Sequence, residues 1–186
     1  MTAKNLYFVA IIPPSDVCAE VLAIQRDFAA RFQSSRSLKV IPHITLKAPF
    51  GYPANCHEDV LNWFNALKIN VSEFFIELRN FGCFPNSKSP VIFIEPVPSH
   101  LLLTLQKKAM RQFVDSFPSE PVMELEIKFT PHLTVAYRDL NPHFFVSAWE
   151  EYSEKKFFAM FQVNEIYLLQ HDGVRWNKIS SVHVNE

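Results

Sequence analysis

The hydrophobic positions along the chain alternate between strand-like and helix-like spacing. Residues 6–12 form a continuous apolar run, which is typical of a buried strand. From Val17 to Phe32, apolar residues recur every three or four positions, which predicts a helix after that strand. The same analysis predicts helices near residues 60–67, 102–117 and 145–152, turns at 51–53 and 171–173, and strands at 40–46, 74–79, 91–94, 123–129, 157–170 and after the second turn.

The strand at residues 123–129 has the clearest period of two. Apolar residues at positions 123, 125, 127 and 129 alternate with charged residues at 124, 126 and 128. Successive side chains of a strand point to opposite faces, so this pattern predicts a half-buried strand.

The order of strands and helices is similar in the two halves of the chain, and no linker or low-complexity segment separates them. We therefore expect an α+β fold in a single domain over residues 1–186. It consists of two related lobes, each a small sheet with helices on one side.

Composition limits the classes of protein that this chain can represent. Hydrophobic residues make up 48% and charged residues 20%, so the chain can bury a substantial core. It has only 3 Gly and no glycine-rich phosphate-binding motif. The formal net charge is −1, whereas proteins that grip duplex DNA usually carry a basic surplus. A small nucleotide or the end of an RNA strand remains a suitable partner.

The cysteines and the first apolar run bear on location. The 3 Cys are odd in number and form no CxxC pair, which argues against a disulfide framework and a cysteine-rich zinc site. The apolar run ends at Pro13 and Pro14 after seven residues, so we interpret it as a strand and not a signal peptide. No segment approaches 18 apolar residues, so no membrane span is expected. These features favour a cytoplasmic protein, and the near-neutral charge favours a monomer.

A short polar motif occurs twice. Residues 42–45 read Pro-His-Ile-Thr and residues 131–134 read Pro-His-Leu-Thr. In a strand, residues i and i+2 share a face, so His43 and Thr45 project together, as do His132 and Thr134. If the lobes are related by approximate two-fold symmetry, the two pairs meet across a groove between them.

Two facing histidines suit phosphodiester cleavage. Imidazole has an unperturbed pKa near 6.5, so one neutral ring and one protonated ring coexist near neutral pH. The neutral ring accepts a proton from the attacking oxygen and the protonated ring supplies one to the leaving oxygen. The threonine hydroxyls can donate hydrogen bonds to the non-bridging phosphate oxygens. This chemistry needs no metal and no cofactor.

The doubled motif resembles the two signature tetrapeptides of the two-histidine (2H) phosphoesterase superfamily, and the chain is most similar to its bacterial 2′-5′ RNA ligase-like proteins. The resemblance implies a bilobal α+β fold, with two pseudo-symmetric lobes of antiparallel sheet and helices around a central groove. It also implies metal-independent opening of 2′,3′-cyclic phosphates on a nucleotide or RNA terminus, giving 2′-phosphates. In some members it also implies reversible 2′-5′ ligation of RNA ends. Carried over by position, His43 and His132 are the acid–base pair, and Thr45 and Thr134 bind the phosphate. We assign His132 as the base and His43 as the acid, although the near-symmetry of the motifs leaves the reverse open.

One position departs from the pattern of this family. Many relatives carry Arg five positions after the second histidine, where this chain has Tyr137, followed by Arg138. Strand parity places Arg138 on the face of His132, and Lys47 on the face of His43. We therefore predict that Lys47 and Arg138 bind substrate phosphate.

Other interpretations of the motif remain open. Each histidine can be a buried, hydrogen-bonded core residue. A zinc site lacks a third and fourth ligand at suitable spacing. The same groove can also hold a nucleotide without turnover, which makes a non-catalytic nucleotide-binding module the alternative function. The other five histidines are expected to be solvated or to cap helices. Phe50, Tyr52 and Phe84 can stack on a base, but core packing is favoured in a chain with 18 Phe.

Overall fold

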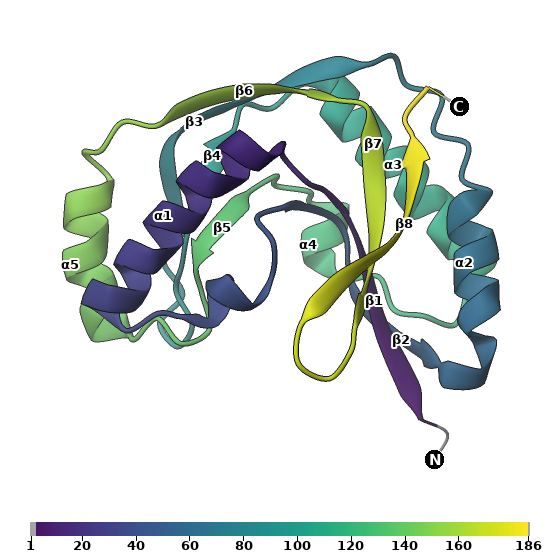
Figure 1. The fold of residues 1–186 in the computed structure, drawn as a ribbon, viewed down its shortest axis with the longest axis horizontal. Coiled ribbons are helices and arrows are strands. Elements are labelled where there is room, and N and C mark those ends of the chain that lie inside the picture. The colour runs from purple at the N-terminus through teal and green to yellow at the C-terminus, as the bar shows by residue number, and fades with distance from the viewer. Residues whose placement is uncertain (1–2, 186) are drawn as a thin grey trace.

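The computed structural model describes residues 3–185 and contains one antiparallel sheet of eight strands in the order β6-β3-β4-β5-β2-β1-β7-β8 (Figure 1). The strands are β1 (Lys4–Ile11), β2 (Ile44–Pro53), β3 (Phe74–Phe84), β4 (Val91–Pro96), β5 (Leu133–Ala136), β6 (Phe158–Val163), β7 (Glu165–His171) and β8 (Trp176–His183). The helices are α1 (Ser15–Phe32), α2 (His57–Asn65), α3 (His100–Ser116), α4 (Glu124–Ile127) and α5 (Pro142–Tyr152), with short 3-10 helices η1 (Arg36–Lys39) and η2 (Ala54–Cys56).

The strand order is symmetric about the central pair, β5 and β2. We call β2, β1, β7 and β8 the first lobe, and β5, β4, β3 and β6 the second lobe. The predicted α+β fold with two related lobes is confirmed. The lobes share one curled sheet, because β2 and β5 pair through Ile44 and Leu133.

Four helices cover one face of this sheet, which we call the outer face. Helices α2 and α3 pack behind the first lobe, and α1 and α5 pack behind the second (Figure 1). Apolar side chains from these helices, including Phe28, Phe64 and Phe113, are fully buried in the main core against the sheet. The arrangement is crossed, since α1 follows a strand of the first lobe and packs behind β5 of the second. Helix α3 crosses in the opposite direction, from β4 to β2. The opposite, inner face of the sheet carries the motifs.

The predicted strand at residues 123–129 is wrong. Residues 124–127 form the short helix α4, in which Leu125 and Ile127 are 76% and 74% exposed. The polar residue Glu126 is buried instead, and its carboxylate accepts hydrogen bonds from the backbone N–H groups of Met123 and Ala48. Because these bonds require the carboxylate to point inward, the alternating pattern here does not describe a strand.

The predicted turn at residues 51–53 is also wrong. Strand β2 continues to Pro53, and its last residues pair with the beginning of β1, where Lys4 lies opposite Pro53. At its other end, β2 begins at Ile44, so residues 40–42 lie before the strand.

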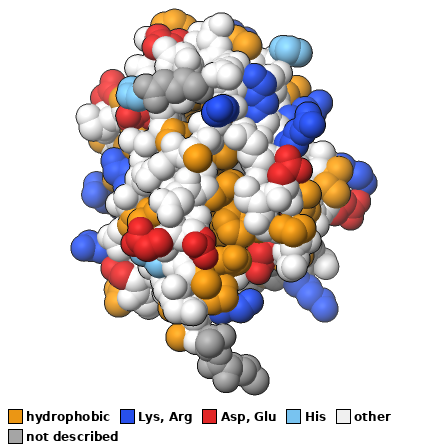
Figure 2. Space-filling model, turned by 90° about the vertical axis from the view of Figure 1, so that its right-hand side faces the viewer, with side chains coloured by type: hydrophobic (Ala, Val, Ile, Leu, Met, Phe, Trp, Pro, Cys, Tyr) orange, Lys and Arg blue, Asp and Glu red, His pale blue; other side chains and the backbone are white. Residues whose placement is uncertain are grey.

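Charged side chains do not gather in one field on the face drawn in Figure 2. Acidic and basic groups there are interspersed around apolar ones. No helix within residues 3–185 has the length and apolarity required to cross a membrane. Over the same residues, no three His, Cys, Asp or Glu side chains are grouped so that they could hold a metal ion.

Candidate active site

The two motifs lie beside each other at the centre of the sheet. Ile44 is opposite Leu133 in an antiparallel pair, and both side chains are buried in the main core. Continuing this register by one residue each way places His43 opposite Thr134, and Thr45 opposite His132. Because neighbours along a strand point to opposite faces, these four side chains are directed to the inner face. All four are partly exposed.

Both imidazoles are held by the same backbone contact. Nδ1 of His43 lies 2.8 Å from the carbonyl oxygen of Ile41, and Nδ1 of His132 lies 2.8 Å from that of Thr130. A carbonyl oxygen can only accept a hydrogen bond, so each Nδ1 carries the hydrogen and donates it. In the neutral ring, Nε2 then bears the lone pair. Both rings are thus oriented to exchange a proton through Nε2.

Burial favours the neutral form of both rings. Desolvation by burial lowers the pKa of His43 to about 4; the bond to Ile41 opposes this shift and nearby His132 adds to it. Burial also lowers the pKa of His132, opposed by its bond to Thr130. Both shifts favour the neutral form of the rings in the free site, and a bound anion would favour protonation.

Phenylalanines form the walls that desolvate these rings. The ring of Phe8 lies 4.8 Å from that of His43, measured between centroids. Phe84 and Phe93 lie 5.3 Å and 5.5 Å from His132. Phe84 was a candidate for base stacking or for the core, and the structure places it at the site. Sequence analysis missed Phe8 and Phe93, because nothing in the sequence distinguishes them from the other phenylalanines.

A β-bulge follows the motif in the first lobe. Thr45 is opposite Ala10, but the next pair along the ladder is Lys47 with Val9, so Leu46 is an extra residue. A bulge interrupts the alternation of faces. Lys47 consequently points with Val9 to the outer face, and Thr45 points with Ala10 to the inner face.

The bulge overturns the predicted placement of Lys47. Its side chain is 2% exposed, and Nζ lies 2.8 Å from Oε1 of Glu126 within the outer core. Lys47 therefore does not share the face of Thr45 and is not available to bind substrate phosphate on the inner face.

The second lobe repeats the bulge at the equivalent place. Thr134 is opposite Phe93, but the next pair is Ala136 with Ile92, which makes Val135 the extra residue. The two motifs therefore match in backbone geometry as well as in sequence.

The strand-parity argument for Arg138 is also wrong. Strand β5 ends at Ala136, and Arg138 has a left-handed backbone with φ of 60°. Its side chain is exposed, with the guanidinium 5.4 Å from the ring centroid of Tyr137. A contact between Arg138 and substrate stays a prediction, without support from strand geometry.

Two buried glutamines brace the motif strands from the outer face. Nε2 of Gln25, on α1, donates to the carbonyl of Thr134 at 3.0 Å. Nε2 of Gln106, on α3, donates to the carbonyl of Glu126 at 3.0 Å and lies 3.5 Å from that of Leu46. Sequence analysis missed both glutamines, which lie on the apolar stripes of their helices.

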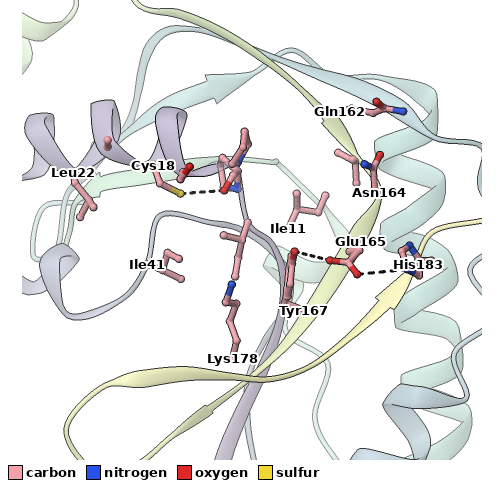
Figure 3. A pocket seen from close by; sticks show the side chains of 16 residues that line it. Ile11, Cys18, Leu22, Ile41, Gln162, Asn164, Glu165, Tyr167, Lys178 and His183 are labelled. Atoms are coloured by element: carbon pink, nitrogen blue, oxygen red, sulfur yellow. Dashed lines mark hydrogen bonds and ion pairs between the residues drawn. The ribbon is translucent and has the colours of Figure 1, made fainter.

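Two pockets flank the motif strands. A pocket of about 600 Å³ in the first lobe lies between the start of α1 and strands β7 and β8 (Figure 3). A pocket of about 450 Å³ in the second lobe is lined by Phe93 and by Thr130, whose carbonyl holds His132. Each volume is in the range of about 300–1,000 Å³ typical of small-molecule sites.

Residues 13–175 match the family model described as the 2′-5′ RNA ligase superfamily. The chain belongs to this superfamily. A Bacillus cytotoxicus protein whose name assigns it to the phosphoesterases is 26% identical over 149 residues, covering 79% of this chain and 81% of the relative.

Solved structures show the same fold as this member of the 2′-5′ RNA ligase superfamily. Escherichia coli LigT complexed with 3′-AMP aligns with a TM-score of 0.67 and 18% identity, covering 99% of this chain and 100% of LigT. The protein TT0787 of Thermus thermophilus aligns with a TM-score of 0.64 and 19% identity, covering 97% and 98% of the two chains. The family assignment confirms the resemblance carried by the two motifs.

Proposed function

We propose that this phosphoesterase opens 2′,3′-cyclic phosphates, on a nucleotide or an RNA end, to 2′-phosphates by acid–base catalysis that needs no metal. The observation that carries the proposal is the pair of matched imidazoles, each donating through Nδ1 to a carbonyl and free at Nε2. Family membership and the 3′-AMP complex of LigT support a nucleotide as the ligand.

The reaction is a single displacement at phosphorus. One imidazole accepts a proton from water as the water oxygen bonds to phosphorus. The bond from phosphorus to the 3′-oxygen breaks, and the other imidazole gives that oxygen a proton. Thr45 and Thr134 donate hydrogen bonds to the non-bridging oxygens, where negative charge is concentrated. A 5′-hydroxyl in place of water would give a 2′-5′ linkage, so the same groups support reversible RNA ligation.

The causes of the two histidine pKa shifts bear on which ring is the general acid and which is the general base. The pKa of His43 is about 4, and that of His132 is lowered from 6.5 by burial only partly offset by its bond to Thr130. Proximity to His132 is a further cause that depresses the pKa of His43. Because the neighbouring imidazole of His132 makes protonation of His43 harder, a single proton shared by the pair would reside on His132, which makes His132 the acid and His43 the base. We propose this assignment, which reverses the one made from the motifs.

The direct test is hydrolysis of the four nucleoside 2′,3′-cyclic monophosphates in excess chelator, with 2′- and 3′-phosphate products separated. We expect turnover to the 2′-phosphate alone. Binding of these nucleotides without turnover would instead identify a non-catalytic nucleotide-binding module.

The pH dependence follows from the depressed pKa values. The productive free enzyme carries one proton on the histidine pair, and this form is most populated between the two pKa values, below pH 6.5. With uridine 2′,3′-cyclic phosphate, we expect kcat/KM to peak below pH 6.5 and then fall, approaching about tenfold per pH unit. The bound anion raises both pKa values, so kcat should peak at a higher pH. An optimum of kcat/KM above pH 7.5 would contradict this account.

A further inference from the structure

A third bulge turns a lysine toward the inner face. In the ladder of β7 and β8, Tyr167 is opposite Ser181, whereas Leu169 is opposite Lys178, which leaves Ile179 as the extra residue. Regular alternation from Ser181 would direct Lys178 to the outer face. Because of the bulge, Lys178 instead joins Leu169 on the inner face and lines the pocket of the first lobe. Bulges commonly re-aim side chains beside functional sites.

The pocket has one apolar side and one polar side (Figure 3). Ile41 and Leu22 lie on one side, and Asn164 and Glu165 lie across from them. The Lys178 side chain extends into the space between, where Nζ lies 5.0 Å from the ring centroid of Tyr167. Apolar walls with a few polar groups suit a nucleoside.

The ammonium of Lys178 is available to an anion. The carboxylate of Glu165 accepts from the Tyr167 hydroxyl at 2.8 Å and lies 3.6 Å from Nε2 of His183. Within residues 3–185, no carboxylate oxygen lies within 4.0 Å of Lys178 Nζ. The pocket of the second lobe is lined by Arg79, but this guanidinium is already paired with the carboxylate of Glu77.

The pocket adjoins the histidines. Tyr167 is opposite Ala10, which is opposite Thr45, so the pocket wall and the motif lie two strands apart on one face. That separation is about 10 Å. Ile41 connects the two sites directly, since it lines the pocket and its carbonyl holds His43.

We propose that this pocket binds the nucleotide that carries the cyclic phosphate, with Lys178 on its 5′-phosphate. The inference rests on the proposed function. It names the substrate class as nucleotides phosphorylated at the 5′ position, either internal to an RNA end or free, in preference to nucleoside cyclic phosphates without that group. Lysine supplies a compact charge that suits a phosphate.

The test compares uridine 2′,3′-cyclic phosphate with and without a 5′-phosphate. For the unmodified protein we expect kcat/KM to be about tenfold higher with the 5′-phosphate, mainly through KM. K178Q should abolish this ratio, whereas K178R should retain it. Arg175→Gln removes a cation from the same hairpin outside the pocket and should also retain the ratio.

Equilibrium binding of the reaction products tests the pocket assignment separately from the proposed catalytic function. Uridine 2′,5′-bisphosphate should bind about tenfold more tightly than uridine 2′-phosphate, and K178Q should remove the difference. Equal affinities in the unmodified protein, or a difference that survives in K178Q, would overturn the pocket assignment. If the difference in affinity depends on Lys178 but no cyclic phosphate is hydrolysed, the pocket assignment stands and the proposed function is overturned.

Discussion

Replacement of either motif histidine by alanine is expected to lower kcat for 2′,3′-cyclic phosphates by about 10²–10⁴-fold, because each ring transfers one proton in the displacement. The double variant should lose less than the product of the single losses, since the two rings act on one transition state. Steady-state rates measure the effect, with His143→Ala as the control, because His143 is an exposed histidine at the start of α5. Full activity of H43A or H132A would eliminate the acid–base proposal.

A substrate with sulfur in place of the 3′-oxygen distinguishes the two roles. A thiol has a pKa of about 8.5, so the thiolate leaves without an acid. H132A should therefore recover most of its lost rate on this substrate, and H43A should not. Recovery by H43A alone would restore the opposite assignment.

The largest expected effect on stability comes from Lys47. Its ammonium neutralises the buried carboxylate of Glu126, and the two side chains are only 2% and 5% exposed. Lys47→Met leaves that carboxylate without its cation and should lower the free energy of unfolding by about 3–5 kcal/mol. Adding Glu126→Gln should recover most of the loss, because an amide oxygen can still accept from the N–H groups of Ala48 and Met123.

Urea unfolding of matched variants checks this prediction. Lys128 pairs with Glu124 on the same short helix, but both side chains are 76% exposed. Lys128→Met should therefore change stability little, as surface pairs usually do. A loss in Lys47→Met no greater than in Lys128→Met would show that burial does not strengthen the pair of Lys47 and Glu126.

The repeated motif made the central part of the site predictable from sequence. Strand parity alone places His43 with Thr45 and His132 with Thr134, and the internal repeat indicated two related lobes. The structure places the four residues on neighbouring strands as that repeat suggested. Their catalytic roles stay proposals that the variants above would test.

The failures came from features that leave no pattern in a sequence. A bulge places one extra residue in a strand, and no residue pattern marks where it occurs. Strand parity therefore gave the wrong face for Lys47 and missed Lys178. The alternation around Glu126 was misleading because its carboxylate binds the backbone N–H of Ala48 and the ammonium of Lys47, which belong to another part of the chain. Long-range partners of this kind decide which side of a short segment is buried, and local periodicity does not contain them.

The crossed packing of α1 and α3 has a consequence for folding and for evolution. Each motif strand is backed by a helix from the other half of the chain, with Gln25 reaching Thr134 and Gln106 reaching Leu46. Neither half can complete its own core, so the halves should unfold together in one cooperative transition. A half-length ancestor could build such a site only as a dimer of two copies that exchanged their first helices, and fusion of the two genes would have made that exchange permanent.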